Sequence, residues 1–162
     1  MKKIIITILI VLCIVIAGTS AYAYHIIREP LVENYTEASN FVTSNELLQS
    51  IDSVHYYHGT TAHYVVKGLD EDGNEAIVWV KDDFETVHYR KASDGITYEQ
   101  AFSIAERALG ERQIEQIRLG FTRGVPVYEV MYNEANQRKG YYYLTFDEGA
   151  FIKRYSIRNI TG

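Results

Sequence analysis

The stretch TYEQAFSIAERALG, residues 97–110, has the pattern of one amphipathic helix. Its apolar side chains recur at helical spacing and fall on one face: Tyr98, Ala101, Phe102, Ala105, Ala108 and Leu109. Thr97 is a good N-cap, Gln100 three residues later completes a capping box, and Gly110 is a typical helix stop. We therefore expect a helix that packs this face against a sheet.

Four strands are expected after this helix, because the chain there is rich in Val, Ile, Tyr and Phe. They are Gln113–Thr122, Val127–Tyr132, Tyr141–Phe146 and Phe151–Ile157. Residues 133–140 form the expected turn between the middle two, and the acidic stretch 147–149 leads into the last strand.

The same order of elements occurs earlier in the chain, offset by 63 or 64 residues. Tyr98 and Ala101 align with Tyr35 and Ala38, and Trp79 aligns with Tyr143. The first copy therefore predicts a helix that starts after Pro30 and ends near Asn45, followed by the strands Val54–Tyr57, Ala62–Lys67, Ala76–Lys81 and Thr86–Arg90.

The fold class predicted is α+β, with two tandem modules of one helix packed on a three- or four-stranded antiparallel sheet. The modules span residues 28–92 and 93–162, and they meet at the short stretch Lys91–Gly95. Two modules joined so tightly should share an interface. Each sheet is expected to have one covered and one wet face. The exception is Ala76–Val80, which is apolar on both faces and is either more deeply buried or turned toward the other copy.

Residues 4–27 contain no charged side chain and follow Lys2 and Lys3. One interpretation is a retained transmembrane anchor over residues 1–27, since about 20 apolar residues span the bilayer core. The other is a secretory signal cleaved after Ala23. Either interpretation places residues 28–162 outside the cytoplasm, and a retained anchor makes this a single-pass membrane protein with a cytoplasmic N-terminus. Cys13, the one cysteine, lies in this run, so the outer part has no disulfide.

The composition of the outer part excludes several functional classes. All 21 acidic and all but two of the 16 basic residues lie beyond residue 27, which gives this part a formal charge of −7. No basic patch is present, which argues against nucleic acid or anionic lipid as a partner. His55, His58 and His63 lack the spacing of a metal site, and Asp70–Asp72 is expected to be a solvated hairpin turn. No catalytic motif is found, so we predict a protein that is not an enzyme and has no metal or cofactor.

Six motifs together resemble one family: YVVKG at 64–68, DEDG at 70–73, VWV at 78–80, DGIT at 94–97, YEV at 128–130 and GYYY at 140–143. With the basic start and single apolar segment, the whole chain resembles the TseB-like, or YpmB-like, cell wall elongation regulators of Firmicutes. The resemblance implies PepSY-like, cystatin-like modules and a membrane-anchored accessory protein. It further implies that the protein binds a transpeptidase-type penicillin-binding protein and influences peptidoglycan synthesis.

The aromatic residues suggest where a partner would bind. Adjacent tyrosines on a strand point to opposite faces, so half of each set is core and the rest is packed between modules or exposed to a partner. The candidate partner surface consists of Tyr57, Tyr64, Trp79, Tyr128, Tyr141 and Tyr143. Two other functions stay open: a protease inhibitor or folding helper, by fold analogy alone, and a sensor that binds a ligand between the modules.

Overall fold

The computed structural model describes residues 12–20, 34–134 and 138–158 of the chain. The chain separates into two compact units, Met1–Glu37 and Ala38–Gly162. In the first unit, residues 12–20 are helical and exposed. No helix within the described ranges is long and apolar enough to cross a membrane. Most of the apolar run 4–27 lies outside these ranges, so the anchor stays a prediction.

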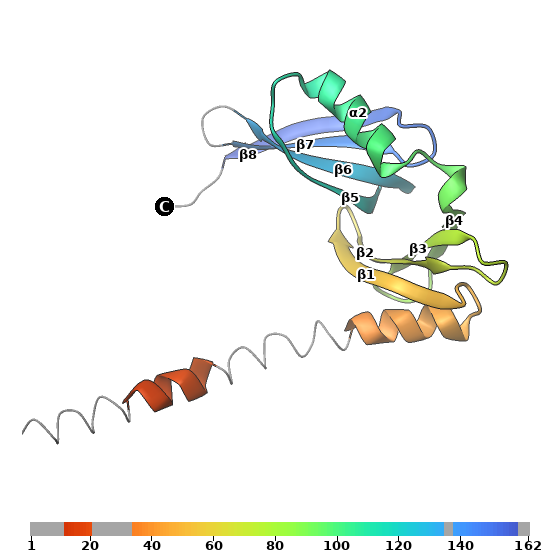
Figure 1. The fold of residues 1–162 in the computed structure, drawn as a ribbon, viewed down its shortest axis with the longest axis vertical. Helices are drawn as coiled ribbons and strands as arrows, with labels where there is room; N and C mark the ends of the chain where they lie inside the picture. The colour runs from red at the N-terminus through yellow and green to blue at the C-terminus, as the bar shows by residue number, and fades with distance from the viewer. Residues whose placement is uncertain (1–11, 21–33, 135–137, 159–162) are drawn as a thin grey trace, which may run out of the picture. The chain divides into compact units, whose positions relative to one another are not determined.

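The second unit contains two four-stranded antiparallel sheets in which each strand pairs with the next (Figure 1). The first sheet consists of β1 (Ser50–His58), β2 (Ala62–Leu69), β3 (Glu75–Lys81) and β4 (Val87–Lys91). The second consists of β5 (Ile114–Thr122), β6 (Val125–Glu134), β7 (Arg138–Thr145) and β8 (Phe151–Arg158). The predicted repeat and strand order are confirmed. The predicted turn 133–140 is too long, because β6 and β7 stay paired as far as Glu134 and Arg138.

One helix packs on each sheet, as expected. The first covers residues 34–44, and the second is α2 (Tyr98–Leu109), which lies across one face of the second sheet (Figure 1). The predicted capping box is present: Gln100 N donates to Thr97 Oγ1 at 3.3 Å, and Thr97 N donates to Gln100 Oε1 at 2.8 Å. Gly110 ends the helix with φ 66°, in the region that favours glycine.

The buried face of α2 is narrower than the sequence pattern predicts. Ala101, Ala105 and Leu109 are buried. Tyr98 and Phe102, assigned to the same stripe, are 50% and 36% exposed.

Both faces of the first sheet are covered, so the predicted wet face is wrong for this sheet. One face packs on the helix over residues 34–44, whose Ala38 and Val42 are fully buried. Val65 and Trp79 lie on the opposite face and belong to a core shared with the second module. The indole of Trp79 packs edge-on against Phe146 with ring centroids 5.5 Å apart. Of the two alternatives for the 76–80 strand, deeper burial or facing the other copy, the structure shows both: its residues are buried, and Trp79 faces the second module.

This shared core joins the two modules into one compact body. It contains residues of the first sheet, α2 and the second sheet: Tyr57, Val65, Ile77, Trp79, Ala101, Ala105, Leu109, Ile117, Leu119, Phe121, Tyr128, Val130, Tyr132, Tyr142, Leu144 and Phe146. The predicted boundary region holds only the short 3₁₀ turn Ala92–Asp94. Neither sheet buries this surface without the other, so we expect the modules to unfold together.

Tyr57 of β1 is the closest point of packing between the modules. Its side chain is fully buried, and its ring lies against Gly120 of β5. A Cβ atom built at Gly120 would lie 2.4 Å from two carbon atoms of that ring. Glycine is therefore required at position 120 because the Tyr57 ring occupies the space of a side chain.

The substitution Gly120→Ala is expected to destabilise the protein by about 1–3 kcal/mol, the usual cost of overpacking a tight core. Urea unfolding of the full chain measures the change. Tyr57→Leu in the same chain removes the ring, so the double variant should lose less stability than the sum of the two single changes. Additive losses would show that the ring and the glycine do not compete for one space.

Candidate interaction site at the junction of the two modules

Strand β5 carries most of the contacts between the modules. On one side, the Phe121 ring lies between the rings of His63 and His88, each with a centroid distance of 4.4 Å. The backbone takes part as well, because His55 Nε2 lies 2.9 Å from the carbonyl oxygen of Leu119. A carbonyl only accepts, so His55 carries its proton on Nε2. The edge of the second sheet is thus held by a face of the first.

Three histidines from three strands face this junction. His55, Val65, Trp79 and His88 are successive cross-strand partners, which places them on one face of the first sheet. Burial lowers the pKa of all three histidines, His55, His63 and His88, below the ordinary value of 6.5. Folding therefore favours the neutral form of each histidine.

The sequence predicts that His55, His58 and His63 are surface residues and not metal ligands. This is wrong for His63, which is 2% exposed and packed on Phe121. His58 is exposed, in line with the prediction. Within the described residues, no group of three His, Cys, Asp or Glu is arranged to hold a metal ion.

A buried carboxylate lies on the other side of β5. Glu129 of β6 is 4% exposed, and Arg118 of β5 binds its Oε1 through Nε and Nη2, both at 2.7 Å. The Tyr57 hydroxyl donates to Oε2 at 3.2 Å, and the Tyr143 hydroxyl donates to the same atom. The carboxylate is therefore satisfied by groups from both modules, as a buried charge requires.

The two tyrosines stay protonated donors. Burial raises the pKa of Tyr57 and of Tyr143 far above the ordinary value of 10.0, and the negative charge of Glu129 raises both further. Sequence reasoning missed Glu129. The sequence feature that could have pointed to Glu129 is its position as the one charged residue in the otherwise apolar run VPVYEVM, residues 125–131.

Most of the predicted partner surface is buried. Five of its six side chains are 0–6% exposed: Tyr57, Tyr64, Trp79, Tyr128 and Tyr143. In this structure they fill the core and the module junction, which corrects their assignment as exposed contact residues. Tyr141 alone of the six is half-buried. Its ring stacks on Tyr155 of β8 at 5.1 Å, so the exposed aromatic surface lies along β8.

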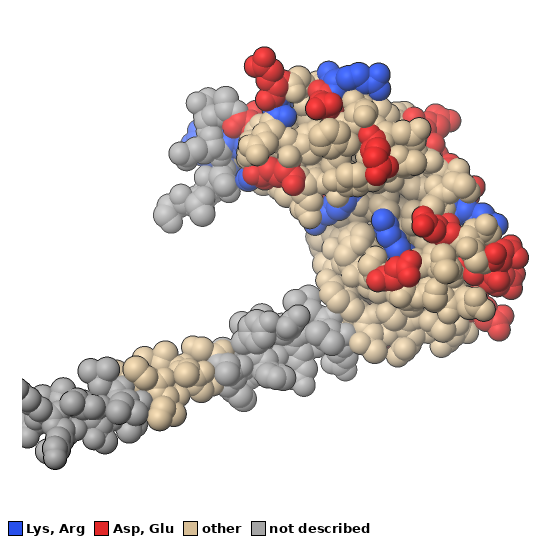
Figure 2. Space-filling model, viewed as in Figure 1, with Lys and Arg blue, Asp and Glu red and all other residues tan. Residues whose placement is uncertain are grey.

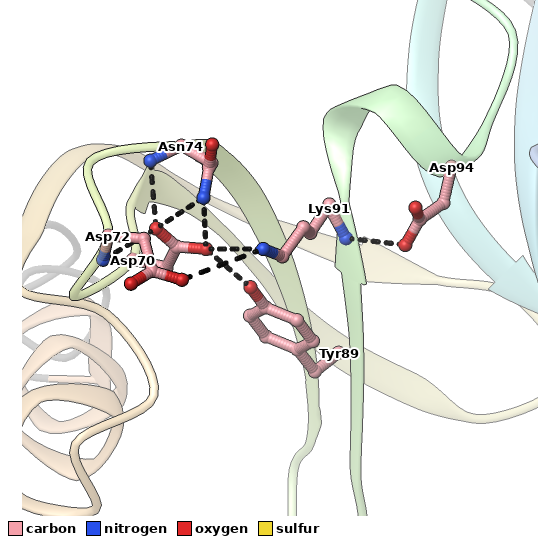
Figure 3. A network of polar contacts seen from close by, with 6 residues as sticks. All are labelled: Asp70, Asp72, Asn74, Tyr89, Lys91 and Asp94. Atoms are coloured by element: carbon pink, nitrogen blue, oxygen red, sulfur yellow. Dashed lines mark hydrogen bonds and ion pairs between the residues drawn. The ribbon is translucent and has the colours of Figure 1, made fainter.

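The acidic loop after β2 is a hairpin closed around one carboxylate (Figure 3). Asp70 accepts hydrogen bonds from the backbone N–H groups of Asp72 and Asn74 at 3.0 and 2.8 Å, and from the Tyr89 hydroxyl at 3.1 Å. Burial acts to raise the pKa of Asp70, but these donors, with Lys91, lower it to about 2. The predicted hairpin turn is confirmed, but Asp70 is 5% exposed and bonded to protein donors, so the turn is not solvated at this residue.

Acidic and basic side chains are interspersed on the face of the protein drawn in Figure 2. The ion pairs on the surface join neighbouring elements, such as Arg90 with Asp147 at 3.5 Å and Arg154 with Glu134 at 3.2 Å. Exposed pairs of this kind contribute little to stability, so the junction described above is the main polar feature of the fold.

Each module matches a known protein family. Residues 37–81, from the first helix to the end of β3, match the cell wall elongation regulator TseB-like domain. Residues 95–155, from the start of α2 into β8, match the peptidase propeptide and YPEB domain, PepSY. Two successive stretches of the chain are thus similar to a TseB-like domain and to a PepSY domain. The resemblance predicted from the sequence motifs is thereby confirmed.

Individual relatives agree with these domains. The chain is 29% identical over 108 residues to a protein of Bacillus subtilis named probable cell wall elongation regulator TseB. That alignment covers 65% of this chain and 66% of the relative, just under two thirds of its length. The solved structure of the YpmB protein from Bacillus subtilis superposes with a TM-score of 0.69 at 25% identity, covering 76% of this chain and 97% of that one.

The substitution Glu129→Gln is expected to destabilise the protein by about 1–3 kcal/mol, because it removes the charged partner of Arg118 and leaves a buried amide facing two hydroxyl donors. Chemical unfolding of the full chain measures the loss. Glu134→Gln on the same strand is the matched control, since its ion pairs lie nearer the surface. Its loss of stability should be only a few tenths of the loss caused by Glu129→Gln. Equal costs for the two variants would contradict a special role for Glu129.

The junction histidines predict a loss of stability in mild acid. Their pKa values are lowered in the folded state, so the unfolded chain binds more protons once the pH falls to about 6.5 and below. Their contribution is fully present above pH 6.5 and is lost as the pH falls through it. Unfolding measured between about pH 7.5 and 5 should show this slope. His63→Gln should flatten it, and His58→Gln, on the exposed side, should not; an unchanged slope in both variants would contradict the assignment.

Proposed function

We propose that this protein is a non-catalytic, membrane-anchored regulator of cell wall elongation that acts outside the cytoplasm by binding a penicillin-binding protein of the transpeptidase type. The observation that carries this proposal is the TseB-like domain, together with the relative named probable cell wall elongation regulator TseB. The activity named for that relative is what we transfer to this chain.

The sequence around the N-terminus supports the proposed location. Residues 4–27 carry no charge and follow two lysines, the order found at a cytoplasmic-to-membrane start. Beyond them the chain has no cysteine, so its fold is independent of the redox state of the compartment. A protein held in this way lies next to the membrane-bound enzymes that build the wall.

The structure supports a binding role through β8. This strand pairs only with β7 among the described residues, so its outer edge is open. Phe151, Tyr155 and Ile157 are 59%, 42% and 50% exposed on this strand. Tyr155 and Ile157 share one face, and Phe151, beyond a bulge, lies on the opposite face against Tyr142. Exposed aromatic and aliphatic side chains on an open edge suit recognition of another protein.

A second candidate is an inhibitor of an extracytoplasmic peptidase, or a helper in its folding. The observation that favours it is the match of residues 95–155 to the peptidase propeptide and YPEB domain. It predicts a partner with peptidase activity in place of a transpeptidase, so identifying the partner separates the two candidates.

The test is photo-crosslinking in living cells with the full-length chain. A photoreactive amino acid at Tyr155 is expected to capture a protein that fluorescent penicillin labels, because β8 offers the exposed surface. The same amino acid at Glu106, an exposed position on α2, is the control and should capture far less. Deletion of the gene should shorten growing cells.

Three outcomes would count against the proposal. Capture of a peptidase at Tyr155 would favour the second candidate. Equal capture at both positions, or no penicillin-labelled protein at either, would remove the evidence for a transpeptidase partner. A reporter fused after Gly162 that is active only in the cytosol would exclude the location.

A further inference from the structure

A groove of about 340 Å³ lies between the modules, next to the contacts made by β5. It is lined by side chains of both sheets and of α2, among them Ser53, His55, Lys67, Tyr98, Gln116 and Arg118. Grooves of this size at the meeting of two modules are common binding sites.

Two sheet edges border this groove. Within the described residues, β1 pairs only with β2, and β5 pairs only with β6. The carbonyl of Leu119 is turned away from β6 and toward the first module, where it accepts from His55. From Leu119 onward the edge of β5 is covered by the first module. The stretch before it, residues 116–118, lines the groove and has no paired strand on its outer side, as an edge that accepts an added peptide does.

Each edge carries an irregularity beside the groove. The register of β1 shifts between Ile51 and Ser53, and that of β5 shifts between Ile114 and Gln116. Such bulges end regular pairing and re-aim the neighbouring side chains, and they are frequent beside binding sites. The two edges consequently do not pair with each other along the groove.

The groove is positively charged. Lys67 is exposed and makes no ion pair in the part of the chain that the structure describes. Arg118 holds Glu129 through Nε and Nη2, and its Nη1 group has no acceptor among the described residues. No Asp or Glu lines the groove. Because Glu129 balances the charge of Arg118, the excess positive charge at the groove comes from Lys67, in a part of the chain whose formal charge is −7.

The pKa of His55 is affected by the same two positive charges. Burial lowers its pKa most, its hydrogen bond to Leu119 opposes this, and the charges of Lys67 and Arg118 lower it further. Lys67 and Arg118 therefore act on His55, and all three side chains line the groove.

We propose that this groove binds an extended, acidic peptide segment of the protein partner, whose backbone pairs with the outer edge of β5 at residues 116–118 while a carboxylate binds Lys67 and Nη1 of Arg118. The inference rests on the proposed function, because it assumes a protein partner, and it names the chemistry that such a partner presents. An open strand edge selects an extended peptide, and the two cations select an acidic one.

The test begins with selection of random linear peptides on the full-length chain held in lipid nanodiscs, with empty nanodiscs used to remove background. We expect enrichment of peptides in which Asp or Glu alternates with β-branched residues. Enrichment of neutral or basic peptides, or of none, would overturn the proposal. Inorganic polyphosphate should compete weakly; full competition would show that charge alone, without strand pairing, is recognised.

Charge reversal locates the site. Lys67→Glu is expected to weaken binding of the selected peptides by about tenfold or more, and Lys67→Ala by less. Lys153→Glu makes the same charge change on β8, the opposite edge of the second sheet, and should leave binding unchanged. If Lys153→Glu weakens binding and Lys67→Glu does not, the peptides bind β8 and the groove is not the site.

A spectroscopic readout separates a direct role of the groove from a change in stability. A bound carboxylate beside His55 should raise its pKa in NMR titrations of the histidine-labelled chain, and the signal of His58 should not move. An unchanged His55 titration with peptide bound would overturn the proposal. Capture of a transpeptidase at Tyr155 that is insensitive to Lys67→Glu would leave the proposed function standing and remove the groove from it.

Discussion

The packing of the first sheet against the edge of β5 is the constraint on which the rest of the structure depends. The Tyr57 ring takes the space beside Gly120 on one side of the strand, and His63 and His88 enclose Phe121 on the other. Burial of these rings removes a large apolar area from water, which is the dominant stabilising term for a chain without disulfides. A single shared core then serves two modules that would each be too small to bury much surface alone.

Polar groups at the junction make this packing specific. Glu129 is acceptable inside the protein because Arg118, Tyr57 and Tyr143 supply donors to it. Of these, the Tyr57 hydroxyl comes from the other module, so the carboxylate is fully satisfied only when the modules dock in this register. A buried charged network adds little net stability but penalises every alternative arrangement that leaves the charge without partners. The modules are thus held by apolar area and aligned by hydrogen bonds.

The same arrangement decides which surfaces remain for binding. Docking of the two modules buries most of the large aromatic side chains. One of them is Trp79, whose indole N–H has no hydrogen-bond partner among the described residues. Two open edges are left: β8, with its exposed apolar side chains, and the bulged stretch of β5 beside Lys67. Both suit strand addition. This agrees with the similarity of the two modules to a TseB-like domain and a PepSY domain.

The sequence by itself determined the elements and their order: the capped helix Tyr98–Leu109, the eight strands and the repeat all follow from local periodicity, capping and turn residues. It did not determine which faces are buried. Of the neighbouring residues Tyr56 and Tyr57, Tyr57 is core and Tyr56 is exposed, and both fit a strand equally well. The second covered face of the first sheet, the burial of His63 and the network around Glu129 were decided by contacts with residues some 60 to 70 positions away. A side-chain period of two shows that a strand has two faces, but only the tertiary packing decides what each face meets.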